Sequence, residues 1–270
     1  MDGADWEDTA MDPVFVLTLA DARERQQRLL AWAAATGLDA SVFVEGVDLR
    51  RGSGGFRAPV EGEERRRQRY GRSALTPPEY GCVLGHRRLW SLLEERGLEW
   101  ALVLEDDARP TCDDWPAAVA ALTTLLEASS LRGRPWVVHL AIDDHRRRTL
   151  ALQPLSWTFP VPPECPGLGA VDPRLGCLWT TTAYLISRAA ARALLADEAA
   201  LPCLADDWEQ RLQRRTVDPL LATRAPLFQP DSALDSQIEH RTRTPTRSID
   251  RPRRKLLTLA YRAGWLARCY

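Results

Sequence analysis

Three consecutive acidic residues, Glu105, Asp106 and Asp107, are the feature of this sequence with the clearest chemical meaning. Adjacent carboxylates that lose hydration repel one another, so their charged state needs a cation or strong hydrogen bonds nearby. Mn²⁺ or Mg²⁺ would meet this need, because such hard ions prefer oxygen ligands and leave coordination positions for a diphosphate. A metal between two phosphates also stabilises the charge that develops on a leaving diphosphate. The triplet therefore predicts a metal site made by all three residues.

The position of the triplet supports this interpretation but leaves an alternative open. Residues 100–104 are an apolar, β-rich run that predicts a buried strand, and the triplet follows it directly. In open α/β sheets, ligands bind at the carboxyl ends of the strands. The alternative is structural: Asp106 and Asp107 would begin a turn, and Glu105 would pair with an arginine.

The elements before the triplet predict an α/β fold. Residues 13–19 and 41–47 are β-rich runs, and residues 21–35 between them begin with a helix-capping pattern. Strand, helix and strand at this spacing indicate a right-handed parallel crossover, as in a Rossmann-like fold with a mostly parallel central sheet. The helix is expected to direct four apolar residues inward: Leu29, Leu30, Ala33 and Ala34.

A second helix is predicted from Thr76 to about Arg96. Thr76 and Glu79 form a capping box around two prolines, a pattern typical of a helix start. One face of this helix is apolar and carries His86. A lone histidine on such a face is most often a hydrogen-bonded core residue.

The rest of the chain alternates between regular elements and two long segments rich in Arg, Gly or Pro. These segments, residues 50–72 and 143–176, have little periodicity, so we expect loops there that select the acceptor of a reaction. Strands are predicted at 136–142 and 178–187, and helices at about 114–126 and 188–196.

The composition is that of a soluble globular protein with one main domain. The 270 residues are 45% hydrophobic with a formal net charge of −1, and an acidic tail (1–12) and a basic tail (241–270) flank a domain at 13–240. The six cysteines form no CxxC pair and lie near no histidine cluster in the sequence, which disfavours a zinc site. The acidic start is unlike a secretory leader, and no apolar run reaches the ~20 residues of a membrane span, so we expect a cytoplasmic protein.

Three segments of the chain carry a resemblance to a known protein family. They are Val16-Leu17-Thr18-Leu19 continuing through Arg23 to Asp48, Leu75-Thr76-Pro77-Pro78-Glu79-Tyr80-Gly81-Cys82-Val83-Leu84-Gly85-His86 continuing to Asp107, and Thr180-Thr181-Thr182-Ala183-Tyr184-Leu185-Ile186-Ser187. Together they resemble glycosyltransferase family 25, the lipopolysaccharide-type β-galactosyltransferases and the related collagen galactosyltransferases. The resemblance implies a GT-A type fold, a UDP-sugar donor, dependence on Mn²⁺ or Mg²⁺, and inversion at the anomeric carbon, with galactose as the default sugar.

The resemblance also implies roles for individual residues. Asp107 matches the last position of the family's DxD-like metal motif, with Glu105 and Asp106 beside it. An inverting transfer needs a base that deprotonates the acceptor hydroxyl, and Asp206 is the first candidate and Asp207 the second. The structural alternative for this acidic pair is an N-cap of the following helix. Contacts to donor or acceptor are expected from Leu19, Arg23, Thr76, Glu79, His86, Glu105, Asp106, Thr181, Thr182, Tyr184, Gln229 and Ser232.

Some of these contacts have a more specific expectation. Thr181, Thr182 and Tyr184 alternate along a predicted strand, so their hydroxyl groups are expected to face the sugar, with β-propensity alone as the alternative explanation. His86 is expected to orient the acidic loop and not to act as the base. Residues 228–232, which include Gln229, resemble the family's C-terminal motif on the donor side.

The leading functional expectation is a metal-dependent glycosyltransferase that acts on a glycan or lipid-linked glycan, as in lipopolysaccharide or other surface-glycan biosynthesis. The alternatives are a metal-dependent phosphoester hydrolase and a non-catalytic, membrane-associated scaffold of the same fold. Residues 251–270 combine basic residues with an amphipathic helical pattern, which suits either docking at the inner face of a membrane or packing on the domain. No nucleic-acid-binding motif is present in the sequence, so nucleic acid is not an expected partner.

Overall fold

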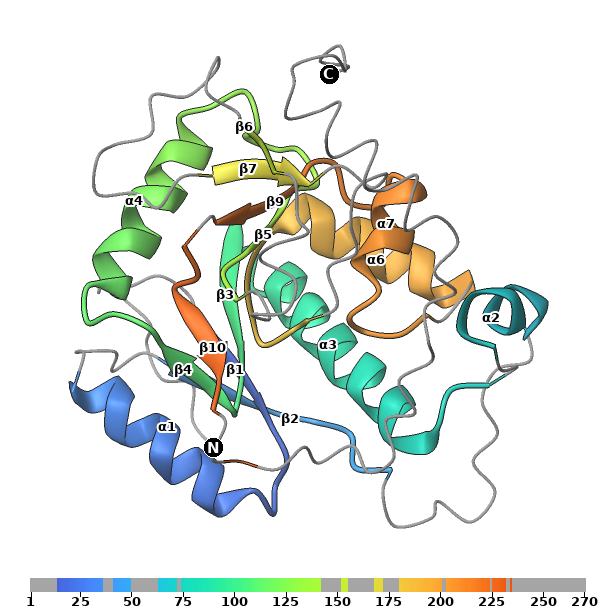
Figure 1. The fold of residues 1–270 in the computed structure, drawn as a ribbon, viewed down its shortest axis with the longest axis horizontal. Coiled ribbons are helices and arrows are strands. Elements are labelled where there is room, and N and C mark those ends of the chain that lie inside the picture. Colours follow the sequence, from blue (N-terminus) through green and yellow to red (C-terminus); the bar gives the residue numbers. More distant parts are fainter. Residues whose placement is uncertain are drawn as a thin grey trace, which may run out of the picture.

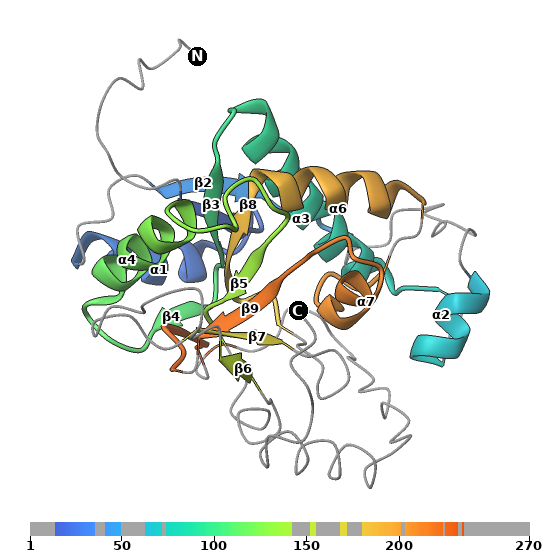
Figure 2. The same cartoon turned by 90° about the horizontal axis from the view of Figure 1, so that it is seen from above.

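The computed structural model describes residues 14–35, 41–49, 63–71, 74–141, 152–154, 168–171, 180–200, 203–223, 225–231 and 234. In this part of the chain, helices cover both faces of an eight-stranded sheet with the strand order β2-β1-β3-β8-β5-β9-β7-β6 (Figures 1 and 2). These strands are β1 (Val14–Thr18), β2 (Ser41–Glu45), β3 (Trp100–Glu105), β5 (Val137–His139), β6 (Leu152–Pro154), β7 (Leu168–Val171), β8 (Ala183–Ser187) and β9 (Leu220–Thr223). A separate two-stranded sheet consists of β4 (Ala108–Pro110) and β10 (Phe228–Pro230).

Six of the eight strands of the central sheet run in the same direction. β1 is parallel to β2 and to β3. β8 is antiparallel to its neighbours β3 and β5, so β5 has the direction of β3 again, and β9 is parallel to β5. β7 runs opposite to β9, and β6 runs opposite to β7. The expected α/β fold with a mostly parallel central sheet is therefore confirmed.

The helices form one layer on each face of the sheet (Figure 2). α1 and α4 pack on one face, and α3, α6 and α7 pack on the other. Because alternate residues of a strand face opposite layers, Leu102 and Leu104 of β3 join the core beneath α1 and α4, while Ala101 and Val103 join the other core. The helices are α1 (Arg23–Ala35), α2 (Glu63–Tyr70), α3 (Pro77–Glu95), α4 (Trp115–Glu127), α6 (Arg188–Ala200) and α7 (Trp208–Gln213).

The unit β1–α1–β2 forms the predicted parallel crossover, but α1 turns a different face inward than expected. Leu29 and Ala33 are buried as predicted, whereas Leu30 is 49% exposed and Ala34 is also exposed. Arg25 is buried in their place, four residues before Leu29. The prediction for Leu30 and Ala34 was wrong because a charged residue occupies the inner face of this helix, where it meets the acidic end of β3.

Both segments that were predicted to be loops contain regular elements. Within 50–72, the described residues 63–70 form α2, whose charged side chains pair one turn apart, as Glu63 does with Arg67. Within 143–176, β6 pairs with β7, and β7 pairs with β9. The loop prediction fails for β6 and β7 because strands of three and four residues are too short to show a periodic pattern, and β7 is also paired with β9 outside the segment.

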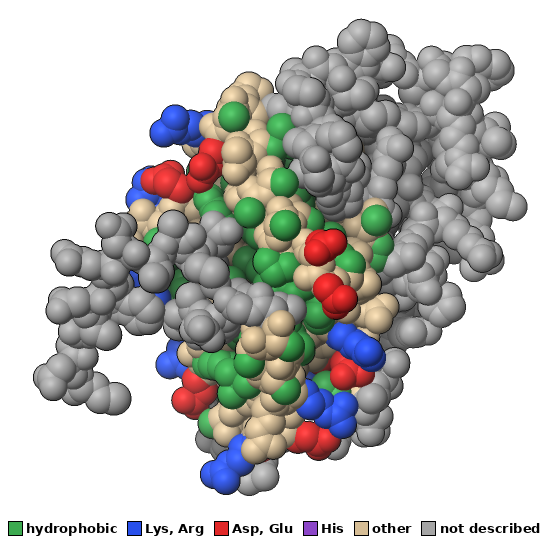
Figure 3. All heavy atoms as spheres, turned by 90° about the vertical axis from the view of Figure 1, so that its left-hand side faces the viewer, with side chains coloured by type: hydrophobic (Ala, Val, Ile, Leu, Met, Phe, Trp, Pro, Cys, Tyr) green, Lys and Arg blue, Asp and Glu red, His purple; other side chains and the backbone are tan. Residues whose placement is uncertain are grey.

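The surface over α1 and α4 mixes side-chain types. Hydrophobic side chains reach the surface there between scattered basic and acidic ones (Figure 3). Among the described residues, no helix is both long enough and apolar enough to cross a membrane. The predicted tails at 1–12 and 241–270, including the amphipathic pattern at 251–270, lie outside the described residues.

Candidate active site

The acidic triplet lies at the carboxyl end of β3, between β1 and β8, as the sequence predicted. Glu105 is the last residue of β3, and its N–H donates to the carbonyl of Thr182 over 2.9 Å. Asp106 and Asp107 form the turn into β4. Since side chains alternate along the strand, Glu105 extends toward α3, and Asp106 extends toward α1. The triplet therefore touches both helical layers of the fold.

Asp106 is held by residues of the first strand–helix unit. The guanidinium of Arg25 donates to Oδ1 over 2.8 Å, and the hydroxyl of Thr18 donates to Oδ2 over 2.8 Å. Burial raises the pKa of Asp106, and the bonds from Arg25 and Thr18 oppose that rise. Both carboxylate oxygens have donors within the chain. This geometry favours an orienting role for Asp106 over the metal-ligand role that was expected.

Asp107 is the member of the triplet whose charge is least compensated. Its Oδ2 lies 3.6 Å from Nη1 of Arg25, and its Oδ1 is buried without a hydrogen-bond partner among the described residues. Burial, followed by the nearby negative charge of Glu105, raises the pKa of Asp107 to about 7. A divalent cation in contact with Oδ1 would stabilise the charged form, so the residues present fit the expected metal.

Glu105 ends a chain of hydrogen bonds that reaches into the core. The hydroxyl of Thr181 donates to Oε1 over 2.5 Å, and Nε2 of His86 lies 3.4 Å from the same oxygen. Nδ1 of His86 lies 2.9 Å from the hydroxyl of Tyr184, which accepts a 3.1 Å bond from the indole N–H of Trp90. Because the indole can only donate, we assign the Tyr184 hydroxyl as donor to Nδ1, which places the imidazole proton on Nε2. His86 therefore lies beside Glu105, and its expected role in orienting the acidic loop stays a prediction.

The same contacts correct the expected direction of three hydroxyl groups. β8 begins only after Thr181 and Thr182, so these residues precede the strand and do not alternate along it. Both threonine side chains are buried, and that of Thr181 is bonded to Glu105. Tyr184 is fully buried with its hydroxyl against His86, so a sugar cannot contact it directly. These residues support the carboxylate and not, by direct contact, a ligand.

Residues 228–231, near the C-terminal end of the described chain, lie beside the turn formed by Asp106 and Asp107. β10 pairs antiparallel with β4, which places Gln229 opposite Arg109. The N–H of Asp231 donates to the carbonyl of Asp107 over 2.7 Å. The motif expected on the donor side thus lies beside the triplet, and Gln229 is exposed there. Ser232 lies outside the described residues.

Asp207 caps a helix, which is the structural alternative given above for the pair Asp206 and Asp207. It is fully buried and is the N-cap of α7, where its Oδ1 accepts a 3.2 Å bond from the N–H of Gln210. Its Oδ2 accepts a 2.6 Å bond from the hydroxyl of Tyr70, at the end of α2. Both oxygens are therefore engaged, which disfavours Asp207 as a base.

Asp206 is buried in the segment before α7, two residues before Trp208. The indole N–H of Trp208 donates to the carbonyl of Thr180 over 2.9 Å. The next residue along that segment, Thr181, bonds Glu105. Two predicted acidic motifs that lie far apart in the sequence are thereby connected through one short segment.

The remaining predicted contacts fall in two places. Leu19 follows β1 at the same edge of the sheet as the triplet, and Arg23 is the exposed first residue of α1. Thr76 and Glu79 begin α3, where the Glu79 carboxylate accepts bonds from both the N–H and the hydroxyl of Thr76. A helix rises about 1.5 Å per residue, so Glu79 lies about 10 Å along the axis from His86. In the described structure, Thr76 and Glu79 act as a helix cap away from the triplet.

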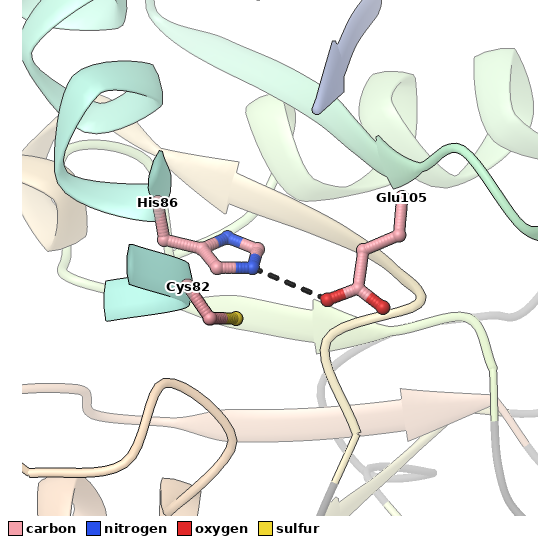
Figure 4. A group of neighbouring side chains, drawn as sticks. All are labelled: Cys82, His86 and Glu105. Carbon is pink, nitrogen blue, oxygen red and sulfur yellow. Dashed lines mark hydrogen bonds and ion pairs between the residues drawn. The ribbon is translucent and has the colours of Figure 1, made fainter. Parts of the chain in front are cut away.

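Two residues near the triplet were not found from the sequence. One is Arg25. It lies four residues before Leu29, and this spacing of about one helical turn places both residues on the same face of α1. Cys82 is the other: its Sγ, a ring nitrogen of His86 and a carboxylate oxygen of Glu105 all lie within 4.8 Å of one another (Figure 4). The sequence patterns considered for a zinc site were CxxC pairs and histidine clusters. Neither pattern includes a cysteine and a single histidine one helical turn apart.

Comparison with known proteins places the sequence among glycosyltransferase-like chains. Residues 11–111 match the family model described as glycosyltransferase family 25 (LPS biosynthesis protein). The probable inactive glycosyltransferase 25 family member 3 of Bos taurus is 29% identical over 248 residues, which cover 78% of this chain and 36% of that protein. The inactive glycosyltransferase 25 family member 3 of Homo sapiens is 35% identical over 112 residues, or 36% of this chain and 17% of that protein. The chain therefore spans about a third of the bovine relative and less of the human one.

Two solved structures are distantly similar to this chain. Mannose-1-phosphate geranyltransferase from Thermus thermophilus aligns with a TM-score of 0.37 at 15% identity, covering 82% of this chain and 75% of that one. A glycosyltransferase involved in the glycosylation of the major capsid of PBCV-1 aligns with a TM-score of 0.36 at 10% identity, covering 83% and 94%.

Proposed function

We propose that this chain, a relative of glycosyltransferase family 25, is a metal-dependent glycosyltransferase that transfers a hexose from a UDP-sugar to a glycan acceptor. Galactose is the default sugar, and lipopolysaccharide or another surface glycan is the proposed setting. The family match supports sugar transfer in general. The donor, the metal and the acceptor are parts of the proposal.

One observation carries the proposal: a half-buried carboxylate with one buried, orphaned oxygen, at the sheet edge where α/β proteins bind ligands. Asp107 has a pKa raised to about 7 and a buried Oδ1 without a hydrogen-bond partner in the described part of the chain. A carboxylate oxygen that is buried without a partner destabilises the folded state unless a ligand compensates its charge. Mn²⁺ or Mg²⁺, held by Asp107 and Glu105, would supply charge stabilisation to a departing diphosphate.

The neighbouring residues keep the carboxylates in place. Arg25 and Thr18 fix Asp106, so the turn that carries Asp107 cannot rotate away from β3. Thr181 fixes the carboxylate of Glu105. Because these bonds exist before any ligand arrives, the site is preorganised and reorganises little when a donor binds.

The acceptor hydroxyl needs a base, and we propose Asp206 for this role. The proposal rests on its burial in a segment linked to the triplet through Trp208 and Thr180. An aspartate carboxylate can accept the proton of an acceptor hydroxyl as a general base. Asp207 is not proposed as the base, because Gln210 and Tyr70 already engage its oxygens.

A donor screen tests the proposed function. The purified protein is incubated with UDP-Gal, UDP-Glc, UDP-GlcNAc or UDP-GalNAc, with Mn²⁺ or with a chelator, and release of UDP is measured. We expect Mn²⁺-dependent hydrolysis of one donor, its loss in Asp107→Asn, and its retention in Asp113→Asn, an exposed aspartate outside the triplet. A folded protein that neither binds UDP with Mn²⁺ nor turns over any of these donors contradicts the proposal.

A non-catalytic protein of the same fold is the second candidate, and one observation favours it. Both relatives described above carry the word inactive in their names. Calorimetric titration separates the two candidates: an enzyme binds UDP in the presence of Mn²⁺, and Asp107→Asn abolishes the heat. Absence of heat for the unaltered protein favours the non-catalytic candidate.

A further inference from the structure

The side chains of Cys82, His86 and Glu105 converge from two elements on one point. Cys82 and His86 are one turn apart on α3, so they project from the same face of the helix. Glu105 reaches this face from the end of β3, and Figure 4 shows the thiol and the imidazole directed toward its carboxylate. The three ligand atoms lie within 4.8 Å of one another.

We propose that these three residues form a second metal site, suited to Zn²⁺ or a similar borderline ion. A thiolate sulfur, an imidazole nitrogen and a carboxylate oxygen are all established zinc ligands, whereas Mn²⁺ and Mg²⁺ prefer oxygen alone. Three protein ligands leave the fourth tetrahedral position open. The site thus differs in chemistry from the all-carboxylate site proposed at Asp107.

The separation between nitrogen and oxygen fits a tetrahedral ion. Zinc lies about 2.0–2.1 Å from histidine nitrogen and carboxylate oxygen, so two such ligands at the tetrahedral angle are about 3.4 Å apart. Nε2 of His86 and Oε1 of Glu105 are separated by 3.4 Å, which is long for a hydrogen bond. The sulfur of Cys82 lies within 4.8 Å of both other ligand atoms.

Buried neighbours hold the ligands in this orientation. The 2.9 Å contact between Nδ1 of His86 and the Tyr184 hydroxyl directs Nε2 toward Glu105, and Trp90 fixes that hydroxyl in turn. A metal-bound histidine usually donates its second ring N–H to a supporting group. Binding of the ion at Nε2 would therefore shift the imidazole proton from Nε2 to Nδ1, which would then donate to the oxygen of the Tyr184 hydroxyl. Cys82 is not in a disulfide, and its thiol would release its proton to solvent when the ion binds.

The two metal sites share Glu105, and this gives the second site a functional consequence. An ion bound by Cys82 and His86 would draw the Glu105 carboxylate toward α3. Mn²⁺ at Asp107 would then lose Glu105, one of its two proposed carboxylate ligands, and bind more weakly. Zn²⁺ is therefore expected to inhibit any Mn²⁺-dependent activity. The existence of the second site does not depend on that activity.

Cobalt spectroscopy on the metal-free full chain tests the site directly. Co²⁺ replaces zinc and gives a near-ultraviolet charge-transfer band only when a thiolate is a ligand. We expect this band in the unaltered protein, its removal by added Zn²⁺, and its loss in Cys82→Ser. The matched control is Cys112→Ser, which removes an exposed thiol elsewhere in the chain and should keep the band.

Two further variants complete the design. Glu105→Gln should weaken Co²⁺ binding about tenfold or more, because loss of a supporting group alone costs that much. Asp107→Asn should keep the band although it loses Mn²⁺ and UDP, so failure of the second site and failure of the proposed function are distinguishable. Absence of a thiolate band in the folded protein, or an unchanged band in Cys82→Ser, overturns the proposal.

Discussion

Replacing Asp107 with asparagine should stabilise the metal-free protein at neutral and alkaline pH. The fold raises the pKa of Asp107 from an ordinary 3.8 to about 7. Such a difference corresponds to about 4 kcal/mol of free energy that the charged carboxylate costs the folded state. The side chain is 24% exposed, and solvent screening lowers this figure, so we expect a gain of about 2 kcal/mol in the free energy of unfolding.

The pH dependence of this gain follows from the direction of the pKa change. A carboxyl with a raised pKa keeps its proton longer in the folded state, so its contribution to stability is lost as pH rises from about 4 through 7. The advantage of Asp107→Asn should therefore be full at pH 8 and absent at pH 4. Urea unfolding in a chelator at several pH values measures it, with Asp113→Asn as the exposed control. Adding Mn²⁺ should reverse the order, because only the unaltered protein gains a ligand.

This reasoning has a clear refutation. If Asp107→Asn is as stable as the unaltered protein at pH 8, or less stable, the carboxylate is not strained by its surroundings. The physical argument for a cation at Asp107 would then lose its basis, whatever the activity assays show.

Three other substitutions test the remaining structure. Burial, followed by the charge of Arg211, lowers the pKa of His139 to about 3, so stability should fall as pH drops from about 6.5 toward 3; His139→Leu should remove most of this acid sensitivity in urea titrations. Tyr70→Phe should lower the free energy of unfolding by about 1–2 kcal/mol in the same assay, because a buried oxygen of Asp207 loses its donor. Arg25→Met should cost about 3 kcal/mol or more at pH 8, since Asp106 would be left charged and buried, and the loss should shrink at pH 4.

Local signals predicted the elements that position the triplet. The capping box at Thr76 and the apolar run before Glu105 each carry their information within a few residues, so α3 and β3 lie where expected. The triplet's place at the carboxyl end of a central strand followed from the same signals. Contacts that join distant segments carry no such local signature. The pairings of β7 and β10, and the bond from Tyr70 to Asp207, could not be derived from spacing.

The misjudged residues in the site share one cause. Sequence periodicity gives the face of a helix on which a residue lies, but not which neighbour it meets across the fold. The sequence assigned no role to Arg25, because Asp106, the partner that compensates its buried charge, comes from another element. Tyr184 was expected at a ligand because its hydroxyl is polar, whereas Trp90 and His86 satisfy that hydroxyl inside the core.

The pairing of β4 with β10 can form only after the ribosome has synthesised residues 228–230. The segment that matches the family model ends at residue 111, yet the carbonyl of Asp107 receives its hydrogen bond from Asp231, far later in the chain. While the ribosome is still making the middle of the chain, the acidic turn has no second strand beside it. A fragment that stops at residue 111 would contain the whole match to the family model and still lack the strand that pairs with β4 beside the acidic turn.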